Sequence, residues 1–207
     1  NAVEMDVGST VASETVNPFV GCVEYSVTYD VLLKEEGEKK TNAEKIAAMN
    51  KKLMGDRETV CYNRKGDWVV IHSNAELIDR IWYFTDSNKE YSYFKSGVLK
   101  FAKNDVLPSD EAEGQEITRF EKTEEHIEIL GINAQEYKVV RSSGMKTSYW
   151  ASSTLIQNPA SYQQNLFSYT NELHANLKGI VLRSEQNISD VFLNSKNAIS
   201  IIREEPD

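Results

Sequence analysis

The residues best suited to chemistry form one short acidic stretch that includes a histidine, Glu124-Glu125-His126-Ile127-Glu128. On a strand, Glu124, His126 and Glu128 would point to one face, because successive side chains alternate between the two faces. Three such ligands could hold a divalent metal ion. Side chains on one face of a strand stand about 7 Å apart, however, so a neighbouring element would have to supply a fourth ligand. A solvated outer face explains the stretch more simply, and we predict no metal site.

The sequence shows no signature of nucleophilic or cofactor chemistry. His72 and His174 are isolated, and neither has a Cys or Ser beside it in a recognisable nucleophile setting. Gly-x-Ser-x-Gly, His-Glu-x-x-His, Walker and dinucleotide-binding patterns are absent. None of the 32 acidic residues stands in an apolar sequence setting typical of a catalytic carboxyl group. We therefore predict a protein without enzymatic activity and without a cofactor, and a hydrolase that uses unrecognised acids remains an alternative.

Two cysteines, Cys22 and Cys61, have neither a C-x-x-C arrangement nor metal-ligand spacing, which argues against a structural zinc site. In an exported protein they could form one disulfide that closes a loop of about 40 residues and contributes roughly 3 to 4 kcal/mol. Two buried free thiols are an equally acceptable interpretation.

Composition limits the class of protein. The chain has 207 residues and a net charge of −9, with a mass of 23.5 kDa, a pI of about 5.0 and a mean hydropathy of −0.49. A nucleic-acid partner or an anionic membrane surface would require a concentrated positive field, and no basic run provides one. No stretch reaches the roughly 18 to 20 apolar residues of a spanning helix. We expect a globular protein with no transmembrane segment, in which any lipid anchor would lie in removed sequence.

The chain begins with small, polar, aperiodic residues, which predict a flexible leader over 1–17 and a single domain over 18–207. From Phe19 the sequence FVGCVEYSVTYDVLL alternates between apolar and polar residues and predicts a long, half-buried strand. Thr41-Asn42-Ala43-Glu44 has the spacing of a capping box, so we expect a helix from there to Gly55.

Runs of β-branched and aromatic residues, each ended by turn residues, predict strands over 57–64, 68–73, 77–85, 90–95, 98–101, 116–122, 125–130, 134–141 and 145–151. The segment 104–115 is expected to be an exposed loop, 162–178 a second helical segment, and 180–186, 188–193 and 198–203 three closing strands. A sheet of about ten strands cannot remain flat, because strand twist accumulates. We expect it to curve around the two helices, which leaves either a filled core or a pocket on the concave side.

Several segments resemble a known family. They are ILGINAQEYKVVRSSGMKTSYWASSTL, with Leu130-Gly131, Tyr137-Lys138-Val139, Gly144 and Tyr149-Trp150 as matching positions, and GCVEYSVTYDV, KIAAMNKKLMG and LKGIVLRSE. The pattern is similar to that of the LolA-like family, which shares the lipoprotein-localisation fold and consists of exported Gram-negative proteins, many of unknown function. The resemblance implies an α+β fold in which a strongly curved, unclosed antiparallel half-barrel has about two helices over its concave face. It also implies a location in the periplasm or at the outer membrane, an apolar cavity, and no catalytic residues.

Such a cavity needs aliphatic and aromatic side chains on the concave face and a helix that can move aside. The candidate lining residues are Val23, Tyr25, Val27, Ile46, Met49, Leu53, Trp68, Val70, Trp82, Phe84 and Trp150. An ordinary packed core built from the same residues is the alternative.

We therefore predict a non-enzymatic envelope protein that binds an acyl chain, a lipid or a lipoprotein in a half-barrel cavity. The alternative is an outer-membrane-associated interaction or structural module that recognises protein or glycan through its outer surface. The aromatic-rich region around Tyr83, Tyr91, Tyr93 and Phe94 could serve that purpose if it is exposed, although cross-strand pairing also accounts for it.

Overall fold

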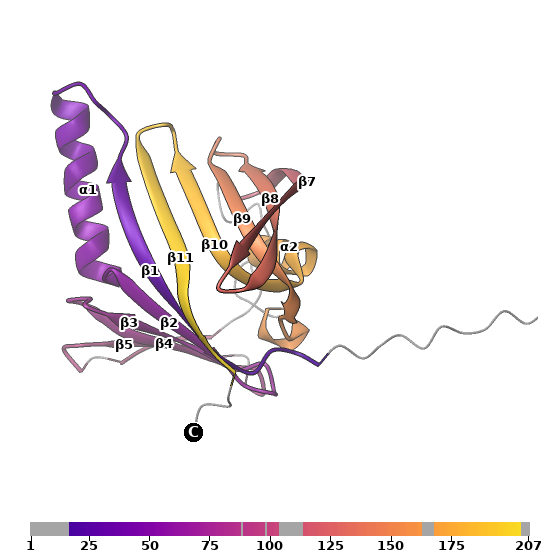
Figure 1. The fold of residues 1–207 in the computed structure, drawn as a ribbon. Coiled ribbons are helices and arrows are strands. Elements are labelled where there is room, and N and C mark those ends of the chain that lie inside the picture. The colour runs from indigo at the N-terminus through magenta and orange to yellow at the C-terminus, as the bar shows by residue number, and fades with distance from the viewer. Residues whose placement is uncertain (1–16, 88, 98, 104–113, 163–167, 204–207) are drawn as a thin grey trace, which may run out of the picture.

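One antiparallel sheet dominates the computed structural model, which describes residues 17–87, 89–97, 99–103, 114–162 and 168–203. Residues 1–16 of the predicted leader over 1–17, and residues 104–113 of the predicted loop over 104–115, lie outside the described residues. Figure 1 shows that the sheet is strongly twisted, with β2–β5 running at a large angle to β9–β11 and β7 crossing β8.

The sheet has eleven strands and does not close. Its spatial order is β6-β5-β4-β3-β2-β1-β11-β10-β9-β8-β7. In chain order the strands are β1 (Gly21–Val31), β2 (Arg57–Tyr62), β3 (Trp68–Ser73), β4 (Ile78–Phe84), β5 (Lys89–Phe94), β6 (Leu99–Lys103), β7 (Ile117–Ile129), β8 (Ile132–Arg141), β9 (Lys146–Ile156), β10 (Gly179–Ile188) and β11 (Phe192–Ile202). The prediction of a large, unclosed antiparallel sheet accompanied by two helices is confirmed.

In two parts of the sheet, residues 188–193 and residues 116–130, the observed strands differ from the strands that the sequence predicts. The residues around 188–193 form no separate strand, because Ser189 and Asp190 adopt left-handed backbone angles with φ of 55° and 56° and turn β10 into β11. Two closing strands therefore replace the expected three. Near the other edge, 116–122 and 125–130 are one strand, β7, with an irregular register between Lys122 and His126.

The register of the ladders assigns each side chain to one of two faces. We call them the Tyr25 face and the Thr28 face after two residues of β1. Val23, Tyr25 and Val27 are buried on the first face, as the alternation predicts. On the second face, Cys22 lies directly opposite Cys61 of β2, and a disulfide joins the two residues.

The two helices lie in different positions relative to the sheet. α1 (Glu38–Met54) runs beside β1 (Figure 1), next to the half of that strand that β2 does not pair with. α2 (Ser168–Leu177) packs through Leu173 and Leu177 against Val139 and Ala151. Val139 belongs to the Tyr25 face, because register links it through Thr147, Gln186 and Asn194 to Tyr29. Only α2 therefore covers the face on which both helices were expected.

The short 3-10 helix η2 (Pro159–Ser161) begins the segment that leads to α2. The main apolar core lies between β1, β2 and β10, where Val23, Tyr25, Val60, Ile180 and Leu182 are packed together. Within the described part of the chain, neither helix is long and apolar enough to cross a membrane.

Candidate functional site

A pocket of about 280 Å³ lies between the Tyr25 face and the segment that carries η2 and α2. We call it the lid pocket. Its lining residues are Glu58, Val60, Tyr62, Trp68, Val70, Gln157, Ser161, Tyr162, His174 and Lys196. Register explains why these side chains of β2 and β3 lie together on one wall of the pocket, because Val60 pairs with Val70 and Tyr62 with Trp68. Apolar and aromatic walls with a few converging polar groups are typical of small-molecule sites.

Hydrogen bonds fasten η2 to the sheet. Trp68 Nε1 donates to the carbonyl oxygen of Ser161 over 3.0 Å, and Asn158 Nδ2 donates to the carbonyl oxygen of Arg64 over 3.0 Å. Ser161 Oγ accepts from Gln157 Nε2 at 3.0 Å and donates to the carbonyl oxygen of Asn158 at 2.6 Å. The only donor of the Ser161 hydroxyl is thus already engaged.

Two oppositely charged side chains face each other across the pocket wall. Lys196 of β11 forms an ion pair with Glu58 of β2, and their side chains are only 28% and 14% exposed. Tyr25 lies between them on β1, and its hydroxyl donates to the carbonyl oxygen of Val181 over 2.8 Å. Burial, with the nearby charge of Glu58, raises the pKa of Tyr25 well above its ordinary value. Tyr25 is therefore a neutral phenol beneath the ion pair.

The histidine at the lid is held neutral. Burial, assisted by the charge of Lys196, lowers the pKa of His174 to about 4. Its ring stacks on Tyr162 with 5.7 Å between centroids, and its Nδ1 atom is buried without a hydrogen-bond partner among the residues that the structure describes. The lid pocket therefore offers one cation, one anion and one unused imidazole nitrogen beside apolar walls.

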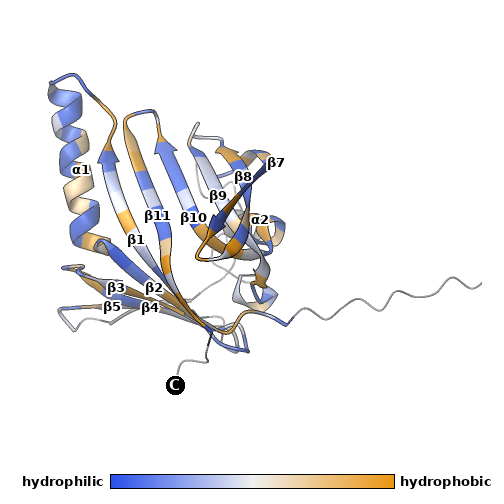
Figure 2. Cartoon of the chain, in the orientation of Figure 1, coloured by the Kyte–Doolittle hydropathy of each residue, from blue (hydrophilic) through white to orange (hydrophobic). Residues whose placement is uncertain are grey.

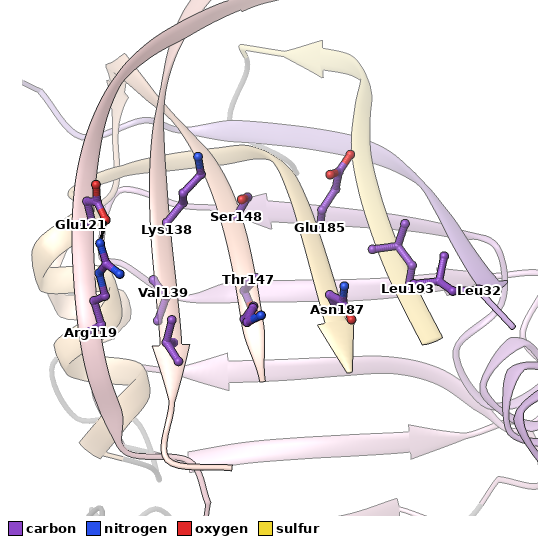
Figure 3. Close-up of a pocket in the computed structure, with 12 residues that line it drawn as sticks. Leu32, Arg119, Glu121, Lys138, Val139, Thr147, Ser148, Glu185, Asn187 and Leu193 are labelled. Atoms are coloured by element: carbon purple, nitrogen blue, oxygen red, sulfur yellow. Dashed lines mark hydrogen bonds and ion pairs between the residues drawn. The ribbon is translucent and has the colours of Figure 1, made fainter. Parts of the chain in front are cut away.

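A second pocket, of about 670 Å³, lies on the Thr28 face (Figure 3). We call it the polar groove. The lining residues that belong to this face are Leu32, Arg119, Glu121, Lys138, Val140, Lys146, Ser148, Glu185, Asn187 and Leu193. Val139 and Thr147, whose side chains register assigns to the Tyr25 face, also border the groove. The two pockets are on opposite faces of the sheet, because Glu185 of the groove pairs with Ser195, whereas the adjacent Lys196 points into the lid pocket.

The charges along the groove are mostly paired. Arg119 and Glu121 are 2.5 Å apart, as the dashed line in Figure 3 indicates, and Lys138 lies 3.3 Å from the buried Glu136. Arg183 forms an ion pair with Glu185 and lies 4.8 Å from the centre of the Trp150 ring.

The structure brings together part of the predicted lining. Trp68 and Val70 line the lid pocket, and Tyr25 lies beneath its ion pair. Val23 is fully buried in the adjoining core. Val27 is also buried, but it lines a separate pocket of about 700 Å³ between β1 and α1.

Other predicted lining residues lie away from that pocket. Ile46 and Met49 are 49% and 56% exposed on α1, and Leu53 is half-buried. The buried residue of α1 is instead Ala43, and Figure 2 shows hydrophilic residues over most of this helix. Trp82 and Phe84 occupy the face of β4 opposite Tyr83, which stacks on Trp68 with 5.5 Å between ring centroids. Trp150 is buried in the core beside the groove.

The residues considered for metal binding remain on the surface. Glu124, His126 and Glu128 are all exposed on β7. Among the residues that the structure describes, no group of three or more His, Cys, Asp or Glu side chains is arranged to hold a metal ion.

The sequence reasoning missed the polar half of the lid pocket. Glu58 carried a usable signal, because it alternates with Val60 and Tyr62 on the buried side of a strand. A charged residue at such a position requires a buried partner or a ligand. Lys196 and His174 gave no comparable signal, since only the long-range register of β11 and the packing of α2 bring them to Glu58.

Comparisons with known proteins give limited information. No family model and no curated protein matches the chain. Two structures of PNGF-II each superpose with a TM-score of 0.46 at 12% identity, covering 90% of this chain and 28% or 29% of theirs. A DUF1329 family protein from Desulfovibrio piger superposes with a TM-score of 0.30 at 6% identity, covering 92% of this chain and 87% of that one. The chain spans less than a third of the length of PNGF-II.

Proposed function

We propose that the protein is a non-enzymatic binding protein of the Gram-negative cell envelope, and that the lid pocket holds the apolar part of a small amphipathic ligand such as an acyl chain. One observation carries this proposal, namely the pocket of about 280 Å³ whose apolar walls adjoin a sheltered ion pair. Val60, Val70 and Tyr162 would contact the chain. The cation of Lys196 and the free Nδ1 atom of His174 would contact a polar head group.

The energetics are adequate for a short chain. Each buried methylene contributes about 0.8 kcal/mol, so eight of them would contribute roughly 6 kcal/mol before the entropic cost of binding. The volume is slightly below the range of about 300 to 1,000 Å³ found for drug-sized ligands. A longer chain would need η2 to move, and that movement would break the bonds from Trp68 and Asn158.

The disulfide supports an envelope location, because disulfides persist in oxidising compartments and are rare in the reducing cytosol. The resemblance to the LolA-like family points to the same compartment. A lipid or lipoprotein ligand, and an anchor in removed sequence, are parts of the same proposal.

The test is a binding measurement with dodecanoate, which competes for the pocket with a fluorescent anilinonaphthalene sulfonate probe. Val70→Trp fills the pocket and is expected to weaken dodecanoate binding at least tenfold. Ile71→Trp is the matched control, because Ile71 is the next residue on β3 and points to the opposite face. Equal binding by the two variants, or no displacement by dodecanoate from the wild-type protein, would reject the proposal.

A second candidate, docking to a partner protein, is favoured by the aromatic face of β4 and β5. The rings of Trp82 and Phe84 are stacked with centroids 5.6 Å apart, and Tyr91 meets Phe84 edge-on. In this case Trp82→Ser would abolish partner capture and leave dodecanoate binding unchanged.

A further inference from the structure

The polar groove is built from two parallel rows of side chains that cross five strands. The first row runs Arg119, Val140, Lys146, Asn187 and Leu193, in which each residue pairs with the next across a ladder. The second row runs Glu121, Lys138, Ser148, Glu185 and Ser195 in the same manner. Figure 3 shows Glu121, Lys138, Ser148 and Glu185 side by side along the groove.

Strand geometry gives the dimensions of this surface. Adjacent strands are about 4.8 Å apart and alternate residues of one strand about 7 Å apart, so the rows cover roughly 19 Å by 7 Å. Such a shape suits an extended ligand that crosses the strands. A compact ligand would leave most of the groove unused.

The charge pattern narrows the chemistry of the ligand. Arg119 is paired with Glu121, Lys138 with Glu136, and Arg183 with Glu185. Because these charges already compensate one another, the groove requires no strongly charged ligand, yet it presents closely spaced donors and acceptors. Lys146 is exposed and has no ion-pair partner among the described residues, which leaves a single positive charge for an acidic substituent.

An apolar chain is a poor occupant of this groove. It would remove the Ser148 hydroxyl and the charged groups of Lys138 and Glu185 from water without replacing the hydrogen bonds that these groups make to water, and each such loss is costly. A hydroxyl group both donates and accepts, so a chain of hydroxyls can meet carboxylate, ammonium and amide groups in any order. Hydrogen bonds to the charged members of the rows are the stronger ones.

We propose that the polar groove binds an oligosaccharide, lying across β7–β11 with its hydroxyl groups on the second row and a less polar ring face against Leu32 and Leu193. Leu32 is 38% exposed at that end and is available for such a contact. This site is separate from the lid pocket, so the protein would hold ligands of opposite polarity on the two faces of one sheet.

The test is calorimetric titration of the full chain with four tetrasaccharides, each to about 5 mM. Chitotetraose, cellotetraose and maltotetraose are the neutral probes, and tetragalacturonate is the acidic one. We expect at least one to bind with 1:1 stoichiometry. If the wild type prefers tetragalacturonate and Lys146→Gln loses that preference, the ligand is an acidic oligosaccharide. If a neutral tetrasaccharide binds equally well to the wild type and to Lys146→Gln, the ligand is a neutral oligosaccharide.

Two matched variants locate the site. Ser148→Tyr places a ring in the centre of the second row and should weaken binding at least tenfold. Ser87→Tyr adds the same ring to the exposed turn between β4 and β5, which is not part of the groove, and should leave binding unchanged. Circular dichroism checks that both variants are folded. If Ser148→Tyr is not folded, Lys138→Met replaces it as the variant that should weaken binding. The proposal is overturned if none of the four sugars binds, if a neutral tetrapeptide binds in their place, or if Val70→Trp rather than Ser148→Tyr removes the binding.

Discussion

The Nζ atom of Lys196 lies 4.2 Å from the centre of the Tyr25 ring and forms an ion pair with Glu58 beyond it. Tyr25 is on β1, which separates the strands that carry the two charges. The pair thus spans a buried aromatic ring at the edge of the lid pocket. Removing either charge would leave the other in a sheltered site without its partner.

We therefore predict that Lys196→Met lowers the free energy of unfolding by about 2 kcal/mol, less than for a fully buried pair because the lysine is partly hydrated. Glu58→Gln combined with Lys196→Met should restore stability to within about 1 kcal/mol of the wild type. Urea unfolding of the wild type, both single variants and the double variant measures the coupling. Additive losses would show that the two charges act independently.

The disulfide is the second source of stability that can be measured. Cys22 and Cys61 are 39 residues apart in sequence, and in the chain-entropy model closing such a loop contributes about 4 kcal/mol. Cys22→Ala with Cys61→Ala should lower the free energy of unfolding by about that amount, and reduction of the wild-type protein should have the same effect. Two titratable thiols in unreduced native protein would show instead that the bond is absent.

The general architecture was predictable from the sequence because period-two patterns are local. Val23, Tyr25 and Val27 alternate with polar residues, and their burial on one face required no information about distant strands. The hairpin at Ser189 and Asp190 was not predictable in the same way. Ile188 and Phe192 prolong an apolar pattern through it, and only the left-handed backbone angles reveal the turn.

The site was less predictable, for two physical reasons. Tyr83 and its neighbours Trp82 and Phe84 are all aromatic, so hydrophobicity alone could not decide which of them belongs to the face that carries the lid pocket. Register places Tyr83 on that face, because Tyr83 pairs with Trp68. On α1, residue size mattered more than hydrophobicity, because Ala43 is the buried residue of this helix and Ala47 is half-buried, whereas the larger Ile46 and Met49 are exposed. Small residues allow the closer approach of helix and strand.

The neutral state of His174 predicts a loss of stability in mild acid. Its pKa is about 4 in the folded protein and about 6.5 in the unfolded chain, so between these values the unfolded state binds more protons. The resulting stability is fully present above pH 6.5 and is lost as pH falls toward 4, by about 3 kcal/mol in total.

Unfolding measurements from pH 7 to pH 4 on His174→Gln isolate this effect, because the carboxylates titrate in both proteins. The variant should show a shallower decline than the wild type. His126→Gln, at an exposed site on β7, is the control and should decline as the wild type does. Parallel curves for wild type and His174→Gln would contradict the assignment.

The contact between the β2–β3 turn and η2 gives the last prediction. Gly66 and Gly97 both have positive φ, of 95° and 78°, so alanine at either position should cost about 1 kcal/mol in backbone strain. A Cβ atom on Gly66 would lie 2.9 Å from the Cβ of Ala160, whereas one on Gly97 would meet nothing within 4 Å. Gly66→Ala should therefore lower the melting temperature more than Gly97→Ala does. The contact with Ala160 would push η2 away from the turn and lengthen the hydrogen bond from Trp68 to Ser161, so only Gly66→Ala should also shift the tryptophan emission. Identical emission spectra for the two variants would mean that this turn does not hold η2 in place.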